Sequence, residues 1–497
     1  MLLLCAEIRA GIRRRHMQAK KLLARKPCKI YGVTFAGGLN PGTRTGAARG
    51  LVANVGTDTQ TAQNDFDHIY PWCARRRCCG YFDEAGAFIV NAYEGEVGYA
   101  TDGTNGEVWV ETPLFFYKHT YDDTSDPIIE EIAISAAPAD GFSPSPMHVN
   151  ADGSLRQKAY TAAYPMGLEN GLPTSRSGVY TAALSLNGAM EAARRLGASY
   201  TTTTASEQYT KCLLMWVEFA TRDVQTVMRG CSTLPYNAAH KATVSEAGTN
   251  RIIIAADNAS NFVTGQGIAI GTWAGGTSIA NNRTVTAIEP YDESNSAITF
   301  DGAPVDIAAG NVVFSVPWKT GSCDGVLASS GSPVSNTSGK YTCVYRGEET
   351  PYGGGFEWIC DVLFKREGSG TEESPYAYDI YYLPDAAKYA NGNVTDDYVK
   401  VNYQLPTASG YVKRLGYDAR YPWVRLPAEV GAMSTTYYAD YYYSPANVVT
   451  AASAGGHWYN TIYAGPTFWD CANAATNAGI TRRARLGCKQ GGKIVDK

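Results

Sequence analysis

Short apolar segments separated by glycine and aspartate recur along the chain after Lys29, and this texture restricts the fold more than any other feature. Segments such as KIYGVTF, GAFIVNAY and GEVWVETPLFFYK alternate or run apolar, which is typical of strands and hairpins. Two stretches favour helices instead: Gly188 to Leu196, and Ser206 to Thr226 with Ser206 as the N-cap. Helices embedded among many short strands predict an α+β fold.

Residues 240–318 differ from their surroundings, with few aromatics and short β-branched runs such as RIIIAA and NVVFSVPW between turn residues. This pattern predicts a small all-β, immunoglobulin-like sandwich or barrel. We interpret it as an insertion, because the preceding texture resumes after it. The expected division is a basic N-terminal arm at 1–29, a first part of the main region at 30–239, the insertion, and a C-terminal core at 319–497. The arm is either a short amphipathic helix for attachment or oligomerisation, or a frayed start.

Charge and hydropathy exclude several classes of partner. The net charge of −4 gives no general attraction to nucleic acid. No stretch approaches the roughly 18–20 apolar residues of a membrane span, so we expect no membrane insertion. The apolar run Met1 to Ala6 precedes the arginines instead of following them, which is the reverse of a signal peptide. Synthesis in the cytoplasm without export is therefore expected.

The sequence lacks the common catalytic and metal-binding motifs. Its six histidines are far apart, and there is no CxxC pair, GxSxG elbow or Walker A loop. Adjacent carboxylates such as Glu348 and Glu349 would face opposite sides of a strand, which is poor geometry for shared acid–base work. We therefore expect no catalytic residues, no metal and no cofactor. An isolated disulfide between Cys471 and Cys488 and a set of buried free thiols both remain open.

The C-terminal third is rich in tyrosine, with about half of the 34 tyrosines after residue 370. Between residues 455 and 486, GGHWYNTIYAGPTFWDCANAATNAGITRRARL, glycines and large aromatics alternate with His, Tyr, Asn, Thr and Asp. Tyrosine offers a large contact area with only two side-chain torsions to freeze, and the small polar residues add hydrogen bonds. The segment is either a recognition surface or a glycine-rich loop with core aromatics.

This segment resembles the variable region of the target proteins of diversity-generating retroelements, which share a C-type-lectin fold related to the formylglycine-generating enzymes. RGEETPYGGGFEW at 346–358 is similar to a second stretch of that fold class. NDFDHIYPWCARRRC, GEVWVETPLFFYK and SPSPMHV resemble phage and prophage tail-associated proteins that carry such a module. The similarity covers most of 30–235 and 320–490 and implies a C-type-lectin-like fold carrying the insertion.

The resemblance also implies roles for individual residues in a variable region of about 437–486. Miscopied adenines would diversify ten ligand-binding positions: His457, Tyr459, Asn460, Thr461, Tyr463, Thr467, Asp470, Ala472, Thr476 and Asn477. Three further candidates are Tyr438, Asp440 and Tyr442, which belong either to the binding face or to the frame. The implied frame comprises Gly455, Gly456, Trp458, Gly465, Phe468, Trp469 and Arg485, with Arg346, Glu348 and Trp358 upstream. Each buried Trp or Phe would contribute about 2–3 kcal/mol.

The function implied is ligand binding by a phage or prophage tail protein, made in the bacterial cytoplasm and carried on the virion. Its partners would be a host cell-surface protein or glycan and other tail proteins, and it would form a homo-trimer or another homo-oligomer. Two alternatives remain: an oxidase of the formylglycine-generating type, and a structural protein that decorates the virion.

Overall fold

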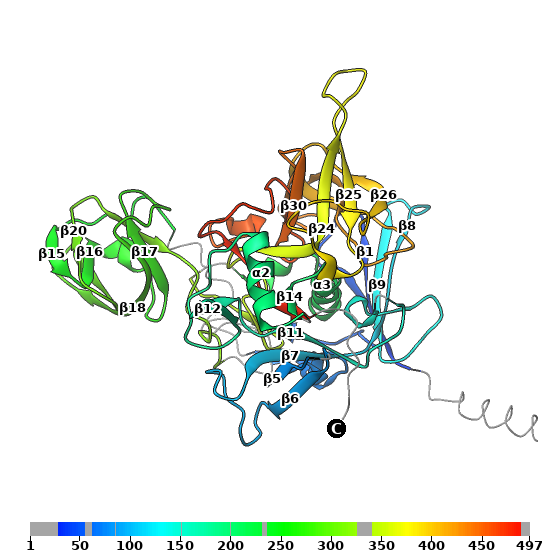
Figure 1. The fold of residues 1–497 in the computed structure, drawn as a ribbon, viewed down its shortest axis with the longest axis horizontal. Helices are drawn as coiled ribbons and strands as arrows, with labels where there is room; N and C mark the ends of the chain where they lie inside the picture. The colour runs from blue at the N-terminus through cyan, green and yellow to red at the C-terminus, as the bar shows by residue number, and fades with distance from the viewer. Residues whose placement is uncertain are drawn as a thin grey trace, which may run out of the picture.

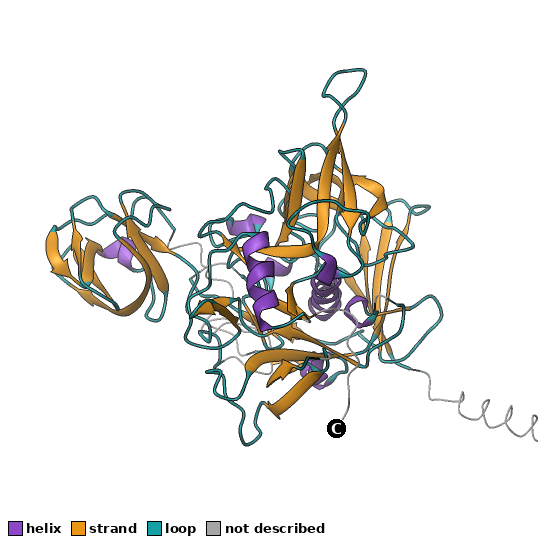
Figure 2. Cartoon of the chain, viewed as in Figure 1, coloured by secondary structure: helices purple, strands orange, loops and turns teal. Residues whose placement is uncertain are grey.

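The computed structural model describes residues 28–54, 62–84, 86–150, 152–198, 200–230, 236–325 and 340–488. Strands make up 38% of the structure and helices 11%, with three α-helices among the described residues (Figure 2). Residues 1–27 of the predicted basic arm lie outside the described residues.

The prediction of an α+β, C-type-lectin-like fold is wrong, because the chain is mostly β. Both predicted helical segments contain an α-helix, α2 at Leu186–Leu196 and α3 at Ala205–Phe219, but α3 ends before the predicted Thr226. The N-cap of α3 is Thr204 instead of Ser206: Thr204 accepts the backbone N–H of Glu207, whose carboxylate accepts the backbone N–H of Thr204. Every residue of α3 is buried, so this helix fills the space between sheets and forms no helical layer of its own.

Two antiparallel sheets come from the N-terminal half. The first has the order β10-β8-β9-β1-β2, and Val33 and Phe35 of β1 alternate into the core. The second has the order β11-β7-β5-β6. Their bounds are β1 Ile30–Ala36, β2 Thr43–Gly46, β8 Phe116–Asp122, β9 Ile129–Ser135, β10 Ser143–Pro144, β5 Arg76–Phe82, β6 Phe88–Tyr93, β7 Glu107–Pro113 and β11 Lys158–Ala162.

The C-terminal third forms a nine-stranded sheet that curls into a half-barrel. Its order is β26-β25-β24-β30-β31-β29-β27-β28, with β32 parallel to β24, and the edge strands β26 and β28 contact each other. The bounds are β24 Phe356–Glu367, β25 Ala377–Tyr382, β26 Val399–Leu405, β27 Gly410–Leu415, β28 Pro427–Ala432, β29 Tyr441–Tyr443, β30 Val449–Ala454, β31 Trp469–Asp470 and β32 Arg482–Arg483.

One core joins the two halves. Leu213 and Trp216 of α3 pack in a cluster that includes Val33 and Trp72 from the N-terminal half and Trp469 from the half-barrel. Figure 1 shows α3 between β24 and the strands β1 and β9. None of the described helices combines the length and the apolarity needed to cross a bilayer.

Residues within 240–318 form seven strands around a separate core of Ile252, Ile254, Ile268, Ile298 and Val313, among others. The strands are β15 Glu246–Thr249, β16 Arg251–Ala255, β17 Gly267–Gly271, β18 Ala280–Pro290, β19 Asn295–Phe300, β20 Val305–Ile307 and β21 Val312–Ser315, with the helix α4 at Ala256–Ala259. They stand apart from the rest of the protein in Figure 1, on the left in green. We call this unit the inserted domain.

The remaining elements are short. The pairs are β3 Ala53–Asn54 with β4 Gln63–Asn64, β12 Gly167–Glu169 with β13 Leu172–Thr174, β14 Tyr200–Thr202 with β33 Leu486–Cys488, and β22 Val344–Tyr345 with β23 Glu348–Glu349. The 3-10 turns are η1 Asp65–His68, η2 Trp72–Ala74, η3 Pro146–His148, η4 Val224–Thr226, η5 Ala386–Lys388 and η6 Thr461–Tyr463.

Candidate ligand-binding surface

The turn that leads into η6 presents side chains to solvent. Gly455 and Gly456 open it with φ of +85° and +70°, angles that side-chain-bearing residues rarely adopt. The backbone N–H of His457 then donates to Asn460 Oδ1 at 2.8 Å, which closes the turn. The side chains exposed by this geometry are Tyr459, Thr461, Ile462 and Tyr463.

Four tyrosines converge beside this turn, and we call them the tyrosine cluster: Tyr411 of β27, Tyr441 and Tyr443 of β29, and Tyr463 of η6. Ring centroids lie 5.1 Å apart for Tyr441 and Tyr463, 5.6 Å for Tyr411 and Tyr463, and 5.2 Å for Tyr411 and Tyr441. Tyr463 is 38% exposed, and the other three rings are partly exposed. Strand alternation turns Tyr442 inward, where it is fully buried.

Tyr459, 54% exposed, extends the exposed aromatic surface toward the inserted domain. Its ring centroid lies 4.2 Å from that of Tyr236, which itself packs against Phe314 of β21. On its other side Tyr459 stacks on the buried ring of His457. Burial, aided by the charge of Arg482, lowers the pKa of His457 to about 3, so this histidine is neutral at physiological pH.

Seven candidate side chains are buried: four that the sequence places on the binding face, His457, Asn460, Thr467 and Asp470, and the three left open between the face and the frame, Tyr438, Asp440 and Tyr442. Each has a structural partner. Asp470 accepts Arg482 Nη2 at 2.6 Å, and Asp440 accepts the backbone N–H of Thr467 at 2.7 Å. Tyr438 donates to Glu130, and Tyr442 donates to the carbonyl of Pro406. Small polar residues serve here as internal hydrogen-bonding groups, so these positions do not belong to the surface.

The last three predicted positions, Ala472, Thr476 and Asn477, lie on the loop between β31 and β32 and are partly or fully exposed. Ala475 in that loop packs with the core under α2 and accepts the backbone N–H of Asn187. Tyr459 and Tyr463 lie instead on the turn at η6, next to Tyr236 and Tyr411. The exposed positions therefore form two groups, one on this turn and one on the loop between β31 and β32.

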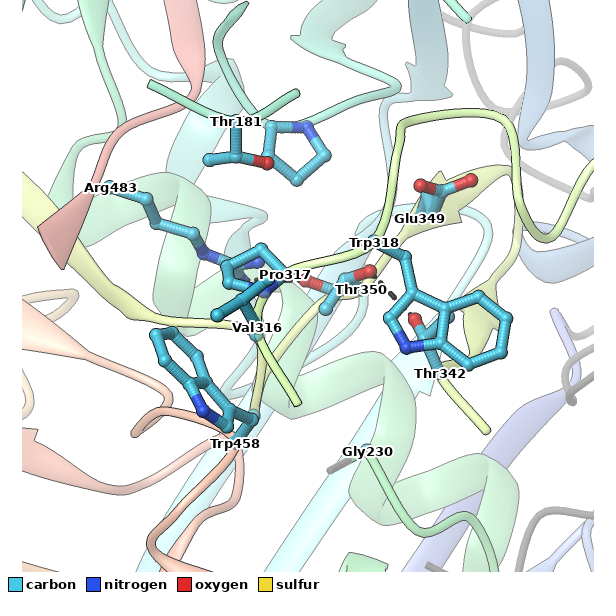
Figure 3. A pocket seen from close by; sticks show the side chains of 13 residues that line it. Thr181, Gly230, Val316, Pro317, Trp318, Thr342, Glu349, Thr350, Trp458 and Arg483 are labelled. Atoms are coloured by element: carbon cyan, nitrogen blue, oxygen red, sulfur yellow. Dashed lines mark hydrogen bonds between the residues drawn. The ribbon is translucent and has the colours of Figure 1, made fainter. Parts of the chain in front are cut away.

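The predicted frame residues of the variable region are all buried. Phe468 and Trp469 pack beneath the turn, and a Cβ on Gly465 would collide with the carboxyl group of Asp440. Trp458 packs against Val312, Phe314 and Val316 of the inserted domain. Figure 3 shows its indole beside Val316, at a cavity of only about 20 Å³, which suits a water molecule and no larger ligand.

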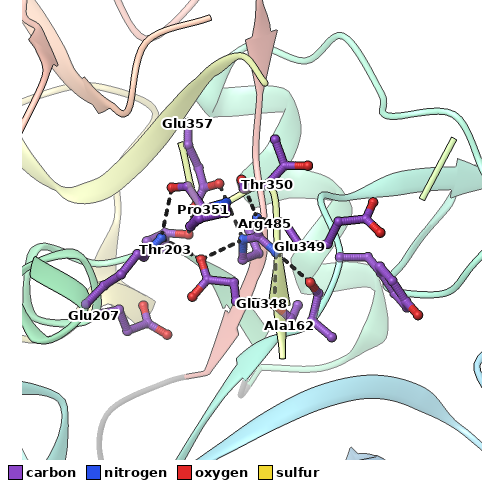
Figure 4. Close-up of polar contacts among 12 residues, drawn as sticks. Ala162, Thr203, Glu207, Glu348, Glu349, Thr350, Pro351, Glu357 and Arg485 are labelled. Atoms are coloured by element: carbon purple, nitrogen blue, oxygen red, sulfur yellow. Dashed lines mark hydrogen bonds and ion pairs between the residues drawn. The ribbon is translucent and has the colours of Figure 1, made fainter. Parts of the chain in front are cut away.

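The upstream frame residue Glu348 belongs to a buried charge cluster with Lys211, Glu357 and Arg485 (Figure 4). Glu348 accepts Lys211 Nζ at 2.5 Å, and Glu357 lies 3.3 Å from Arg485 Nε. Burial alone would raise the pKa of Glu357, but the charges of Arg485, Lys211 and Arg483 lower it to about 2. Arg485 also donates to four backbone carbonyls, those of Ala162, Ala163, Glu349 and Thr350.

Arg346 and Trp358 also have internal roles. Arg346 pairs with Glu218 of α3 at 2.5 Å and with Asp67, and the Trp358 indole donates to the carbonyl of Leu184 at 2.9 Å. These contacts connect the two halves of the chain and contribute no exposed group.

No disulfide joins any two of the ten cysteines within the described residues, Cys471 and Cys488 included, and eight of the ten are buried. Burial raises the pKa of both Cys471 and Cys488, which disfavours the thiolate that nucleophilic or metal chemistry requires. Over the described part of the chain, no three His, Cys, Asp or Glu side chains are arranged to hold a metal ion.

Sequence reasoning missed Tyr411, Tyr441, Tyr443, Tyr236 and Ile462 as members of the exposed surface. Tyr411 is the second residue of the strand GYVKRL, in which Val412 and Leu415 are buried three positions apart, so the segment had no regular alternation that would have identified Tyr411 as exposed. The sequence also held no signal for Tyr236, because its contact with Tyr459 depends on where the inserted domain sits.

No protein-family model matches this chain, and no curated protein matches its sequence. The class is therefore defined by the fold and the surface alone: a mostly β protein with a half-barrel, an inserted β domain and an exposed cluster of tyrosines.

Proposed function

We propose that this chain is a non-enzymatic ligand-binding protein of a phage or prophage tail, which contacts a host cell-surface protein or glycan through the tyrosine cluster. One observation carries the proposal: four tyrosines from three separate elements converge and keep part of their rings in contact with solvent. Tyrosine presents an apolar face and a hydroxyl at a low entropic cost, which suits recognition of protein or sugar.

The buried frame supports this proposal. Exposed aromatic side chains are useful for recognition when the backbone beneath them is rigid. Here the η6 turn is fixed by two glycines, by the hydrogen bond between His457 and Asn460, and by the contact of Trp458 with the inserted domain. Substitution of an exposed residue on this turn would leave these contacts intact.

Diversification by a retroelement is proposed only for exposed positions, which are Tyr459, Thr461, Tyr463, Thr476 and Asn477. Buried Asp470 and Thr467 would not tolerate free variation, because their partners would be left unpaired. Sequencing the locus tests this part: it predicts a reverse-transcriptase gene and a near-copy of the 3′ end of the gene that differs at adenines. A locus without either would remove diversification and leave the binding proposal standing.

Titration of labelled protein onto whole cells of a panel of bacterial strains tests the binding face. The double variant Tyr459→Ser, Tyr463→Ser should bind at least about tenfold more weakly, because truncating an aromatic hot spot costs about 2 kcal/mol or more. The control is Tyr81→Ser, whose ring is similarly exposed on β5. Equal binding by the double variant and the parent would contradict this use of the surface.

The proposed assembly is a homo-oligomer, such as a trimer, that attaches to other virion tail proteins. Light scattering of the purified chain measures the number of copies directly.

A further inference from the structure

A second open cavity, of about 360 Å³, lies between β8 and the loop that follows β27. Tyr117 and Tyr121 line it from β8, and Tyr417 and Arg425 line it from the loop. It is in the size range of small-molecule sites. None of the residues singled out in the sequence falls in it, and it shares no side chain with the tyrosine cluster.

Two arginines stack on tyrosines in this cavity. The guanidinium of Arg414 lies 4.5 Å from the ring centroid of Tyr121 and makes a two-pronged ion pair with Asp123, at 2.6 and 2.8 Å. The guanidinium of Arg425 lies 4.6 Å from the ring centroid of Tyr417. Within the described residues, no carboxylate oxygen lies within ion-pair distance of Arg425, whose side chain is nonetheless buried.

The hydrogen bonds of Arg425 leave donors unused. Its Nε donates to the carbonyl of Pro422 at 3.1 Å, Nη1 to that of Gly416 at 3.3 Å and Nη2 to that of His119 at 3.4 Å. A guanidinium has five N–H groups, so each of the two terminal nitrogens of Arg425 keeps one more donor. Two parallel donors on one guanidinium match the two oxygens of a carboxylate.

The other charges around the cavity are already paired. Lys118 lies 2.6 Å from Glu131, Glu130 lies 2.7 Å from Arg222, and Asp418 lies 2.6 Å from Arg420. Burial lowers the pKa of His119, which leaves that ring neutral. Among the described residues, the buried charge of Arg425 therefore has no counter-charge, and burying an uncompensated charge is unfavourable.

We propose that this cavity binds the carboxylate of an acidic sugar, such as a uronic acid. The two free donors of Arg425 take the carboxylate in a forked pair. The sugar ring lies against Tyr417, which is 52% exposed, and its hydroxyls meet polar groups such as Ser143 at the cavity wall. A free monosaccharide and the terminal residue of a polysaccharide share this chemistry. The site is independent of the tyrosine cluster and of any role in host adsorption.

Calorimetric titration with glucuronate, its methyl ester and glucose tests the proposal on the intact protein. Glucuronate should bind at least tenfold more tightly than the ester, which keeps the ring and loses the charge. A glucuronate oligosaccharide in a further arm distinguishes the two sources: tighter binding of the oligosaccharide indicates a polymer end, and equal binding a free sugar. Three results would overturn the proposal. They are equal affinity for glucuronate and its methyl ester, no detectable binding of glucuronate or its oligosaccharide, and displacement of glucuronate by equimolar inorganic phosphate.

Two variants locate the site. Arg425→Gln should abolish glucuronate binding, and Tyr417→Ala should weaken it at least fivefold. Tyr417 is largely exposed, so its truncation keeps the test decisive if the Arg425 variant fails to fold. Tyr376→Ala, at an exposed tyrosine on the hairpin between β24 and β25, is the matched control and should bind like the parent. Unchanged binding by Tyr417→Ala would exclude this cavity as the site.

Discussion

Gly465 shows how tightly single positions are determined beneath the exposed turn. A Cβ added to it would collide with Oδ1 of Asp440, whose carboxyl group accepts both the backbone N–H and the hydroxyl of Thr467. Burial raises the pKa of Asp440 well above its ordinary value. The residue next to this carboxyl must therefore be small, because the carboxyl cannot move without giving up both hydrogen bonds.

Substitution Gly465→Ala should destabilise the protein by about 1–3 kcal/mol, the usual cost of overpacking a filled interior. Gly479→Ala is the matched control, because a Cβ there meets no neighbouring atom. Urea unfolding of the two variants and the parent measures the difference. A Gly465 variant as stable as the Gly479 variant would show that the carboxyl of Asp440 moves freely.

The type of a residue in this region was easier to predict than its partner. Gly455, Gly456 and Trp458 were predicted to be frame residues, since glycine and tryptophan have few roles on a polar loop, and all three are buried. Thr467 and Asp470 were assigned to the surface and are buried. A short polar side chain suits a surface or an internal hydrogen bond equally well, and only the fold supplies Arg482 as the partner of Asp470.

At the scale of an element, α3 carries polar side chains into the interior. Glu207, Gln208, Lys211 and Glu218 are all buried, and Lys211 and Glu218 are in ion pairs with Glu348 and Arg346. The periodicity of the sequence predicted this helix, but not that its polar side chains are buried as well. Those side chains are covered by residues distant in sequence, which no local pattern records.

Glu207 makes the stability of α3 dependent on pH. Burial raises the pKa of its carboxyl to about 8. The folded state therefore holds this proton where the unfolded chain has lost it, and stability falls as pH rises from about 4.5 to about 8. The variant Glu207→Gln should remove that part of the slope, because glutamine resembles the neutral carboxyl and still completes the capping box.

Urea unfolding at pH 5 and pH 8 measures this effect. Relative to the parent, Glu207→Gln should be more stable at pH 8 than at pH 5. Glu191→Gln, at an exposed position of α2, should show the same difference from the parent at both pH values. A constant offset for Glu207→Gln would contradict the assignment.

At the scale of the whole molecule, the inserted domain has a core of its own and a small apolar contact with Trp458. Residues 237–318 expressed alone should therefore fold with one cooperative thermal transition. Circular dichroism and calorimetry of this fragment check the expectation; a fragment without a transition would show that its fold depends on the remaining chain. In the intact protein, Trp458→Ala should loosen the contact between Trp458 and the inserted domain. The thermal transition of the inserted domain itself should stay unchanged.

The fold class was mispredicted at this scale for a definite reason. The many short strands and both helical segments were identified from the sequence. The two helices were nevertheless taken as evidence for an α+β class, although strands make up most of the regular structure. The strand order of the half-barrel depends on long-range pairings such as β31 beside β30 and β29, which no local pattern encodes.

The last described strand, β33, pairs with β14, and the adjacent Arg485 bonds to carbonyls of Ala162 and Ala163, more than 300 residues earlier. Without these residues, β14 has no strand partner among the described strands, and Glu357 of β24 lacks its ion pair with Arg485. A premature stop codon upstream of Arg485 would therefore be expected to destabilise the N-terminal half as well as the C-terminal third. Such a truncated chain would be a substrate for cellular proteases in both regions.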